Sequence, residues 1–214
     1  MPPIVSVIGL SKSGKTTLVE KLTMELGSRG YRIATVKHTP HGMNFDKPDK
    51  DTWRYLEAGS VAAVASSEDK VVLIRPVAPK TLDGIARILG EDCDLILAEG
   101  FKQGDAPKIE VHRREVGPLH SGIRKLVAVV TDEPVTTKAR QFGFADIKAL
   151  ADLLETGFIK PQRERLSVYV NSAPLSLSTF PKEFVTNILL AMASSLKGVG
   201  RVRSLEIFLR RDKK

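Results

Sequence analysis

The sequence contains very little cysteine and no long hydrophobic run, and each absence excludes a class of protein. Cys93 is the only cysteine among 214 residues, so the chain has no internal disulfide and no cysteine-based metal site. No apolar stretch approaches the ~20 residues that a helix needs to cross a bilayer. The N-terminus runs directly into an apolar, β-branched stretch without a secretory signal. We therefore expect a soluble protein of the cytoplasm that does not associate with membranes.

The chain has an excess of positive charge. Its net charge is +8 and its pI is near 9.6, with 42% hydrophobic and 27% charged residues. A basic surface favours anionic partners such as nucleotides, phosphorylated cofactors, nucleic acid or acidic proteins. The basic residues are spread along the chain, apart from a short tail at residues 210–214, and such a spread is typical of a solvated surface. We expect no nucleic-acid binding.

A phosphate-binding loop is the clearest motif. Residues 9–16, Gly-Leu-Ser-Lys-Ser-Gly-Lys-Thr, match the pattern G-x-x-x-x-G-K-[ST] of P-loop nucleotide-binding proteins. Residues 4–8 before it are apolar and β-branched, which is typical of a buried strand. Leu18, Leu22 and Leu26 after it recur at helical spacing. Strand, glycine loop and helix together form the context that this motif requires.

The chemistry of the loop follows from this arrangement. Glycines let backbone N–H groups approach an anion closely, and the helix N-terminus adds a partial positive charge. Lys15 is expected to reach the β- and γ-phosphates, and the Thr16 hydroxyl to ligate Mg²⁺. The predicted nucleotide-binding residues of the loop are Gly9, Ser11, Lys12, Ser13, Gly14, Lys15, Thr16 and Thr17.

A second strand, which ends in a carboxylate, completes the predicted site. Residues 94–100 form an apolar run that ends in Glu99 and Gly100. P-loop proteins hold Mg²⁺ with a carboxylate at the end of a neighbouring strand. Asp94 begins the run and should lie at the opposite edge of the sheet. We therefore predict Glu99 as the magnesium ligand and, together with Lys15, as a catalytic group.

Selectivity for a base is less clear from the sequence. Asp132 follows the buried strand at residues 126–130, where a carboxylate can accept hydrogen bonds from the N1–H and amino groups of guanine. The sequence contains no Asn-Lys-x-Asp, the usual guanine-reading motif. Asp132 is a candidate, and the choice of base stays open.

A polar segment at residues 38–51 follows the strand predicted at residues 32–37. In an open α/β sheet, ligands bind beyond the C-terminal ends of the strands. His38 and His41 are weak candidates for metal ligands, and Asp46 or Asp51 could approach a magnesium ion. An ordinary surface loop is the third interpretation, and composition alone favours it.

The remaining pattern alternates strands and helices. It predicts an α/β fold of the P-loop NTPase type, with a mostly parallel sheet and helices on both faces. We expect a nucleotide-binding domain at residues 1–159 and a small β-α-β extension at residues 160–214. Helices are expected at residues 51–58, 81–89 and 146–154, the last of them ending at Gly157. The inward side of the helix at residues 81–89 is expected to consist of Leu82, Ile85, Ile88 and Leu89. A further helix is expected in the extension, with an inward apolar face of Phe184, Val185, Ile188, Leu189, Met192 and Leu196. Further strands are expected at residues 61–65, 71–75, 109–111, 166–170 and 202–209.

Several separate motifs, in order, resemble those of one family. They are residues 9–16, Val36-Lys37-His38-x-x-His41-Gly42, Asp46, Lys50-Asp51-Thr52-x-Arg54, Ala58-Gly59-Ser60, Ala98-Glu99-Gly100-Phe101-Lys102 and Pro107-Lys108-Ile109-Glu110-Val111-x-Arg113. Together they resemble the MobB family of molybdopterin-guanine dinucleotide biosynthesis adapter proteins. The resemblance covers residues 4 to 155 and is far more specific than the P-loop alone.

The resemblance implies a function for the chain. It implies a GTP-binding adapter that uses Mg²⁺, is a weak GTPase at most, and forms a homodimer. The implied partner is the molybdenum cofactor guanylyltransferase, which joins GMP to molybdopterin, and molybdopterin itself is a candidate ligand. The resemblance also gives functional weight to His38, His41, Asp46, Lys50, Asp51 and Arg54, with Asp46 as a further candidate for the metal.

Two other functions remain open from the residues. A P-loop kinase that phosphorylates a small acceptor would use the same loop, because phosphoryl transfer needs mainly positioning and charge neutralisation. Arg113, Arg114 and Arg124 are the loose candidates for its lid. A metal-insertion GTPase would need a clustered cysteine-histidine site, for which the sequence offers only Cys93, His38 and His41.

Overall fold

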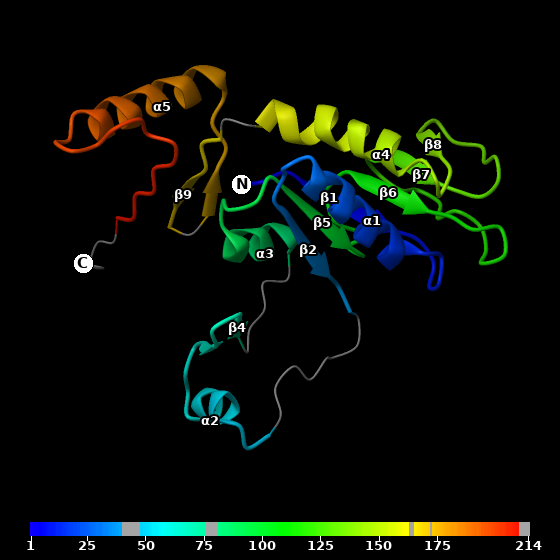
Figure 1. Cartoon of the computed structure of the whole chain (residues 1–214), viewed down its shortest axis with the longest axis horizontal. Coiled ribbons are helices and arrows are strands. Elements are labelled where there is room, and N and C mark those ends of the chain that lie inside the picture. Colours follow the sequence, from blue (N-terminus) through cyan, green and yellow to red (C-terminus); the bar gives the residue numbers. More distant parts are fainter. Residues whose placement is uncertain (40–47, 76–80, 163–164, 172, 210–214) are drawn as a thin grey trace. The chain divides into compact units, whose positions relative to one another are not determined.

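The computed structural model describes residues 1–39, 48–75, 81–162, 165–171 and 173–209 (Figure 1). These residues belong to two compact units, Met1–Glu164 and Arg165–Lys214. Within the described ranges, no helix has the length and apolarity needed to span a membrane.

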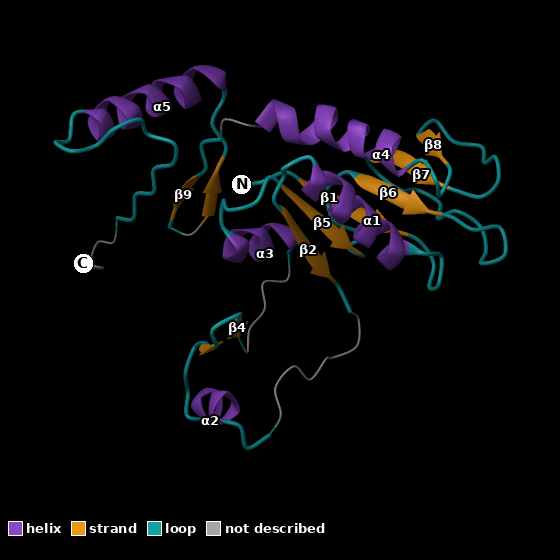
Figure 2. Ribbon diagram, viewed as in Figure 1, coloured by secondary structure: helices purple, strands orange, loops and turns teal. Residues whose placement is uncertain are grey.

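The first unit is built on a six-stranded sheet in which every pair of neighbouring strands is parallel (Figure 2). In spatial order the strands are β2 (Ile33–Lys37), β5 (Leu95–Glu99), β1 (Ile4–Ile8), β6 (Lys108–Val111), β7 (Leu126–Val130) and β8 (Arg140–Phe142). The predicted α/β fold with a mostly parallel sheet is confirmed. The short edge strand β8 was not predicted.

Helices cover both faces of this sheet, as predicted. On one face, α1 (Lys15–Ser28) and α4 (Ile147–Leu154) bury their apolar sides against β1, β5, β6 and β7. On the other face, α3 (Leu82–Leu89) packs through Ala86 against Ile96 of β5. The period-two alternation of side chains along β5 sends Leu95 and Leu97 to the first face and Ile96 to the second.

The predicted inward side of α3 is only partly correct. Thr81 caps the helix, since its hydroxyl accepts from the Gly84 N–H at 3.2 Å, and Gly90 follows the last turn. Leu82 and Ala86 are buried, but Ile88 and Leu89 are 42% and 37% exposed. The small side chain of Ala86 is the one that faces the sheet, so the buried stripe is narrower than the apolar pattern indicated.

The helix predicted through Leu154 is confirmed as α4, but the helical path does not stop at Gly157, where its end was predicted. The chain continues through a π-helical turn, η1 (Glu155–Ile159), and a 3-10 turn, η2 (Lys160–Gln162). A glycine inside a helix costs only about 1 kcal/mol. Ile159 is buried in the core, and the Glu155 carboxylate is held by ion pairs, so tertiary contacts outweigh the helix-stopping tendency of glycine.

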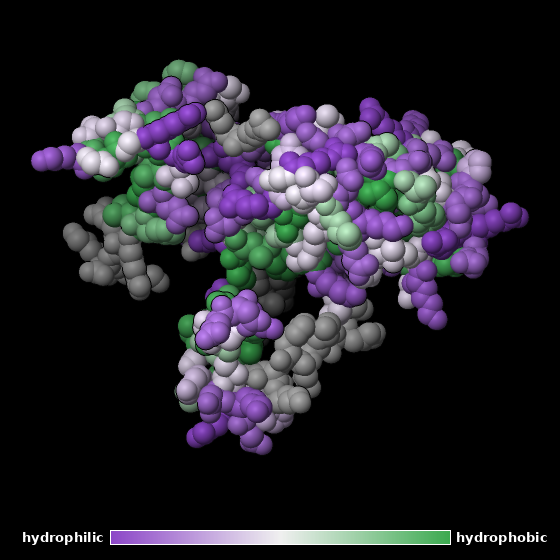
Figure 3. All heavy atoms as spheres, in the orientation of Figure 1, coloured by the Kyte–Doolittle hydropathy of each residue, from purple (hydrophilic) through white to green (hydrophobic). Residues whose placement is uncertain are grey.

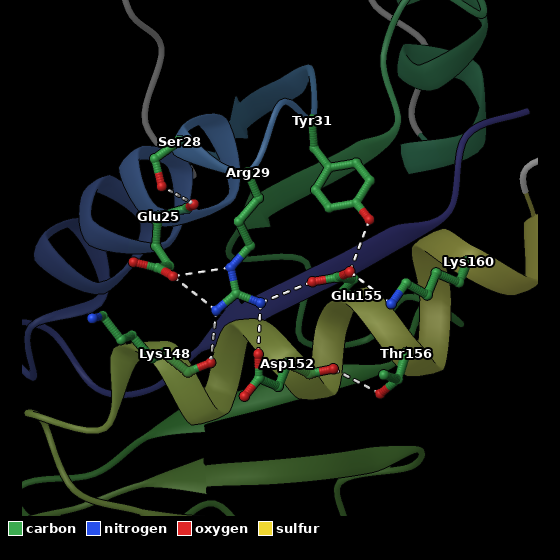
Figure 4. Close-up of polar contacts among 9 residues, drawn as sticks. All are labelled: Glu25, Ser28, Arg29, Tyr31, Lys148, Asp152, Glu155, Thr156 and Lys160. Carbon is green, nitrogen blue, oxygen red and sulfur yellow. Dashed lines mark hydrogen bonds and ion pairs between the residues drawn. The ribbon is translucent and has the colours of Figure 1, made fainter.

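An ion-pair network joins the end of α1 to α4 and η1 (Figure 4). Arg29 Nη1 donates to Asp152 Oδ1 at 2.6 Å and to Glu155 Oε2 at 2.8 Å, and its Nε and Nη2 bind Glu25 Oε1. Glu155 Oε1 also accepts from Tyr31 at 3.0 Å and pairs with Lys160 at 2.8 Å. Hydrogen bonds from Lys160, Arg29 and Tyr31 lower the pKa of Glu155 from 4.5 to about 2.

Replacing Glu155 by glutamine is expected to destabilise the first unit in a pH-dependent way. The pKa of Glu155 is depressed in the folded state, so its contribution is complete above pH 4.5 and is lost as the pH falls toward 2. We expect a thermal midpoint roughly 3–6 °C below the parent at pH 7, and a smaller difference at pH 3. Thermal melts at both pH values measure this, with Glu20→Gln on the exposed side of α1 as control. A difference that stays constant with pH contradicts the assignment.

A small antiparallel hairpin lies between β2 and α3 in the sequence. It consists of β3 (Ala63–Ser66) and β4 (Val71–Ile74), and α2 (Asp51–Glu57) precedes it. Both predicted strands and the predicted short helix are confirmed. The residue at the N-cap position of α2 is Lys50, whereas Asp51 is the first helical residue.

The second unit differs from the predicted β-α-β extension. It contains a hairpin of β9 (Val168–Val170) and β10 (Ala173–Leu175), followed by α5 (Thr179–Ser194). The final strand predicted over residues 202–209 is wrong, because these residues form no strand. The predicted inward face of α5 is also wrong: only Ala193 of the helix is buried, while Phe184, Ile188 and Met192 are exposed. The space-filling view shows polar and apolar side chains mixed on the visible surface of this helix (Figure 3).

Candidate functional site

The phosphate-binding loop connects the C-terminal end of β1 to the N-terminus of α1. Gly9 has φ +144°, and Gly14, at the N-cap of α1, has φ +100°. Residues that carry a side chain rarely adopt these backbone conformations, so the shape of the loop requires glycine at both positions. Lys15 is the first residue of α1, and its Nζ donates to the Leu10 carbonyl at 2.6 Å, across the loop.

The parallel register brings Glu99 beside this loop. Glu99 is the last residue of β5, where it is aligned with Val7 of β1 on one side and with Lys37 of β2 on the other. The Thr16 hydroxyl donates to Glu99 Oε2 at 2.9 Å. Asp94 lies at the opposite end of β5, where its carboxylate accepts from the Arg32 N–H at 2.8 Å.

The two oxygens that meet here fit a magnesium site. Ligands of octahedral Mg²⁺ lie ~2.0–2.1 Å from the ion, so neighbouring ligand oxygens are about 2.9 Å apart. Thr16 Oγ1 and Glu99 Oε2 are 2.9 Å apart, and both are the hard oxygen donors that Mg²⁺ prefers. Thr16 and Glu99 are therefore the residues that would hold the ion.

Two lysines face the same carboxylate. Lys37 Nζ lies 3.7 Å from Glu99 Oε1, and Lys15 is close enough for Glu99 to affect its titration. Burial lowers the pKa of Lys15, Glu99 opposes this shift, and the positive charge of Lys37 adds to it. Lys37 belongs to one of the family motifs, but its position beside Glu99 was not predicted, because it depends on β2 being the neighbour of β5.

The other predicted loop residues differ in exposure. Ser11, Lys12 and Thr17 are exposed, and Lys12 adopts the left-handed conformation with φ +63°. The Ser13 side chain is fully buried behind the loop. Their roles in nucleotide binding remain predictions.

Asp132 lies near the loop with its carboxylate already engaged. Its Oδ1 accepts from the Arg114 N–H at 3.0 Å, and its Oδ2 is 3.6 Å from Arg113 Nη1. The Arg114 N–H is the largest cause that lowers the pKa of Asp132. The Arg113 guanidinium also lies 4.1 Å from the centre of the Phe144 ring, and both side chains border Gly14. Guanine recognition by Asp132 remains a prediction.

The residues predicted for the loop after β2 are only partly described. The His38 N–H donates to the Glu99 carbonyl at 3.0 Å, and its ring packs against Phe101 with 4.8 Å between centroids. Lys50 and Asp51 lie at the start of α2 and Arg54 in its last turn, and among the described residues none of the three makes a hydrogen bond or ion pair with the phosphate-binding loop. His41 and Asp46 lie outside the described residues.

The residues considered for the two alternative functions have other partners or positions. Arg124 pairs with Asp105, Arg114 with Glu133, and Arg113 with Asp132, so each of the three arginines already has a carboxylate partner. Cys93 is buried at the N-terminal end of β5, away from the phosphate-binding loop. Among the residues described, no group of three or more His, Cys, Asp or Glu side chains is arranged to hold a metal ion.

Comparisons with known proteins show the family to which the chain is similar. The family model of molybdopterin guanine dinucleotide synthesis protein B (MobB) matches residues 4–132. A Haemophilus influenzae protein named molybdopterin-guanine dinucleotide biosynthesis adapter protein is 37% identical over 156 residues, which are 72% of this chain and 88% of that protein. An Escherichia coli K12 protein of the same name is 32% identical over 161 residues, 72% of this chain and 92% of that protein.

Solved structures give the same result at the level of the fold. The crystal structure of a MobB protein homolog from Bacillus stearothermophilus superposes with a TM-score of 0.56 and 26% identity, covering 72% of this chain and 96% of that one. The family match includes the phosphate-binding loop and β5 with Glu99. On these grounds the chain belongs to the MobB family, molybdopterin guanine dinucleotide synthesis protein B.

Proposed function

We propose that this chain is a GTP-binding adapter in molybdopterin guanine dinucleotide biosynthesis, acting beside the guanylyltransferase that attaches GMP to molybdopterin. The proposal rests on one observation: in a chain of the MobB family, Lys15, Thr16 and Glu99 lie together at the C-terminal ends of the strands β1 and β5. Lys15 and the loop N–H groups would bind the phosphates, and Thr16 and Glu99 would hold Mg²⁺. The ion would supply neutralisation of phosphate charge.

The same residues support weak hydrolysis at most. Fast GTP hydrolysis requires an arginine that reaches the transferring phosphate and a group that orients the attacking water. Arg113 lies beside Gly14, but Phe144 and Asp132 hold its guanidinium. We therefore propose that binding of GTP, rather than its hydrolysis, is what the adapter uses.

Binding to the guanylyltransferase tests the adapter role. We propose a cytoplasmic homodimer that contacts the transferase, with a higher affinity in the presence of GTP and Mg²⁺. Sedimentation velocity of the two purified proteins, alone and mixed, measures both the dimer and the complex. No complex at micromolar concentrations, with or without nucleotide, contradicts the proposal.

Replacing Glu99 by glutamine is expected to remove the magnesium dependence of GTP binding. The amide keeps the size of the side chain but loses the negative charge that attracts the cation. We expect GTP affinity in Mg²⁺ to fall by about 10-fold and affinity in EDTA to change by less than about 2-fold. Calorimetric titration under both conditions measures this. Asp94→Asn, at the other end of β5, is the matched control, and an equal loss in EDTA would show that Glu99 does not act through the metal.

A further inference from the structure

A large cavity opens from the phosphate-binding loop on the side of β5. Its volume is about 730 Å³, and Gly9 and Lys15 of the loop form one wall. The opposite walls come from the segment after β5, which includes Lys102, from the start of α3, and from His120. Lys15 is the residue expected at the β- and γ-phosphates, so this cavity faces the terminal phosphate end of a bound nucleotide.

His120 is held in the cavity wall by a buried carboxylate. Glu110 of β6 is 2% exposed, and its Oε1 accepts from both the backbone N–H of His120 at 2.8 Å and from Nδ1 at 2.7 Å. Because Nδ1 is used by Glu110, Nε2 is the ring nitrogen available to the cavity. Only the imidazolium form of histidine carries an N–H donor on both ring nitrogens, so this is the form that would bind an anion through Nε2 while Nδ1 donates to Glu110.

Lys108, the second buried charged residue of β6, holds the segment after β5 that forms another wall of the cavity. Lys108 lies two residues before Glu110 on the same strand and is 1% exposed. Its Nζ donates to the carbonyl oxygens of Gly104 at 2.6 Å, Ala106 at 2.9 Å and Arg124 at 3.3 Å. Burying a charged side chain costs free energy, and apolar residues at these two positions of β6 would stabilise the sheet without that cost. Glu110 and Lys108 therefore indicate that the loops around the cavity are held in fixed positions.

Charged groups of both signs line the cavity: Lys15 and Lys102 are basic, and Asp83 and Asp105 are acidic. Asp105 is paired with Arg124 at 3.6 Å and Lys125 at 3.9 Å, whereas Lys102 makes no ion pair within the described part of the chain. Lys102 and the Nε2 atom of His120 are therefore the groups of the wall that can meet an anion.

We propose that this cavity is a second ligand site, beside the nucleotide, in which His120 and Lys102 bind the phosphate group of a small phosphorylated molecule. Glu110 is the positioning residue that orients His120 through Nδ1, and Lys108 fixes the segment that carries Lys102. The proposal rests on the nucleotide site described above, because the phosphate-binding loop forms one wall. It places a second phosphorylated ligand next to the terminal phosphate of the nucleotide.

Histidine NMR on the full chain tests the proposal. The phosphate-binding loop is first saturated with Mg²⁺ and a non-hydrolysable GTP analogue, and inorganic phosphate is then titrated while the ring signals of the 4 histidines are recorded. We expect a saturable shift of the His120 signal. His120→Gln and, on the exposed loop, Lys102→Met are each expected to weaken phosphate binding by about 5-fold or more.

His112→Gln is the matched control, because His112 is also buried and paired with a carboxylate, Glu133 at 3.1 Å, but lies outside this cavity. It should leave phosphate affinity within about 2-fold of the parent. An unmoved His120 signal, or parental affinity in both test variants, overturns the proposal. Calorimetry of the GTP analogue on the same samples separates the two claims: if the analogue does not bind but His120 still responds, the proposed function fails and the second site stands.

Discussion

Replacing Lys15 by alanine is expected to weaken GTP binding by about 100-fold, which corresponds to about 2.7 kcal/mol, without unfolding the protein. The loss follows from removing a charge that is half-buried beside Glu99 and is placed to meet the β- and γ-phosphates. In the structure Lys15 makes one side-chain hydrogen bond, to the Leu10 carbonyl, so little of the fold depends on it. Calorimetric titration with GTP and Mg²⁺ measures the effect.

A matched variant separates this effect from a general loss of positive charge. Lys21 is exposed on the same helix, and Lys21→Ala removes the same charge. We expect its GTP affinity to stay within about 2-fold of the parent, because exposed charges are screened at physiological salt. Equal affinities in Lys15→Ala and the parent would show that the loop does not bind the nucleotide as proposed.

Replacing Gly9 by alanine is expected to damage both the fold and the nucleotide site. A Cβ atom at Gly9 would lie 2.3 Å from the Val111 carbonyl oxygen and 2.8 Å from Ser13 Oγ. The first neighbour is backbone of β6 and cannot rotate away, and φ at Gly9 is +144°. We expect a loss of about 3 kcal/mol or more, and a thermal midpoint lower by about 6–12 °C.

Gly27→Ala is the control for Gly9→Ala. Gly27 lies in α1, and nothing lies within 4 Å of a Cβ built there. Alanine is the better helix former, so this variant should match or exceed the parent by up to about 1 kcal/mol. Thermal melts with a parallel GTP titration measure both variants. A Gly9→Ala protein that melts with the parent would show that the loop does not pack against β6 as described.

The local features of the site could be predicted because they depend on short stretches of chain. The strand before the phosphate-binding loop, the helix after it and the carboxylate at the end of β5 follow from periodicity and from one motif. The position of Glu99 opposite the loop requires β5 to be the neighbour of β1, and parallel α/β topology favours that arrangement. The capping of α3 by Thr81 likewise depends on its immediate neighbours.

Features that depend on distant partners could not be predicted. The strand expected at residues 202–209 has the right residues, but a strand also needs a neighbour to accept its hydrogen bonds. Strand β8 is short and largely exposed, so it lacks a hydrophobic pattern. The pairing of Glu110 with His120 spans a loop whose path the sequence does not specify, and Lys37 joins the site only through the order of the sheet.

The rate of molybdopterin guanylylation by the guanylyltransferase tests the central claim most directly. It is measured with the transferase alone, with the parent chain, and with Lys15→Ala. The nucleotide-dependent adapter role predicts a faster reaction with the parent chain and no stimulation by Lys15→Ala. No stimulation by the parent chain would contradict the adapter role, and equal stimulation by both proteins would contradict its dependence on the nucleotide.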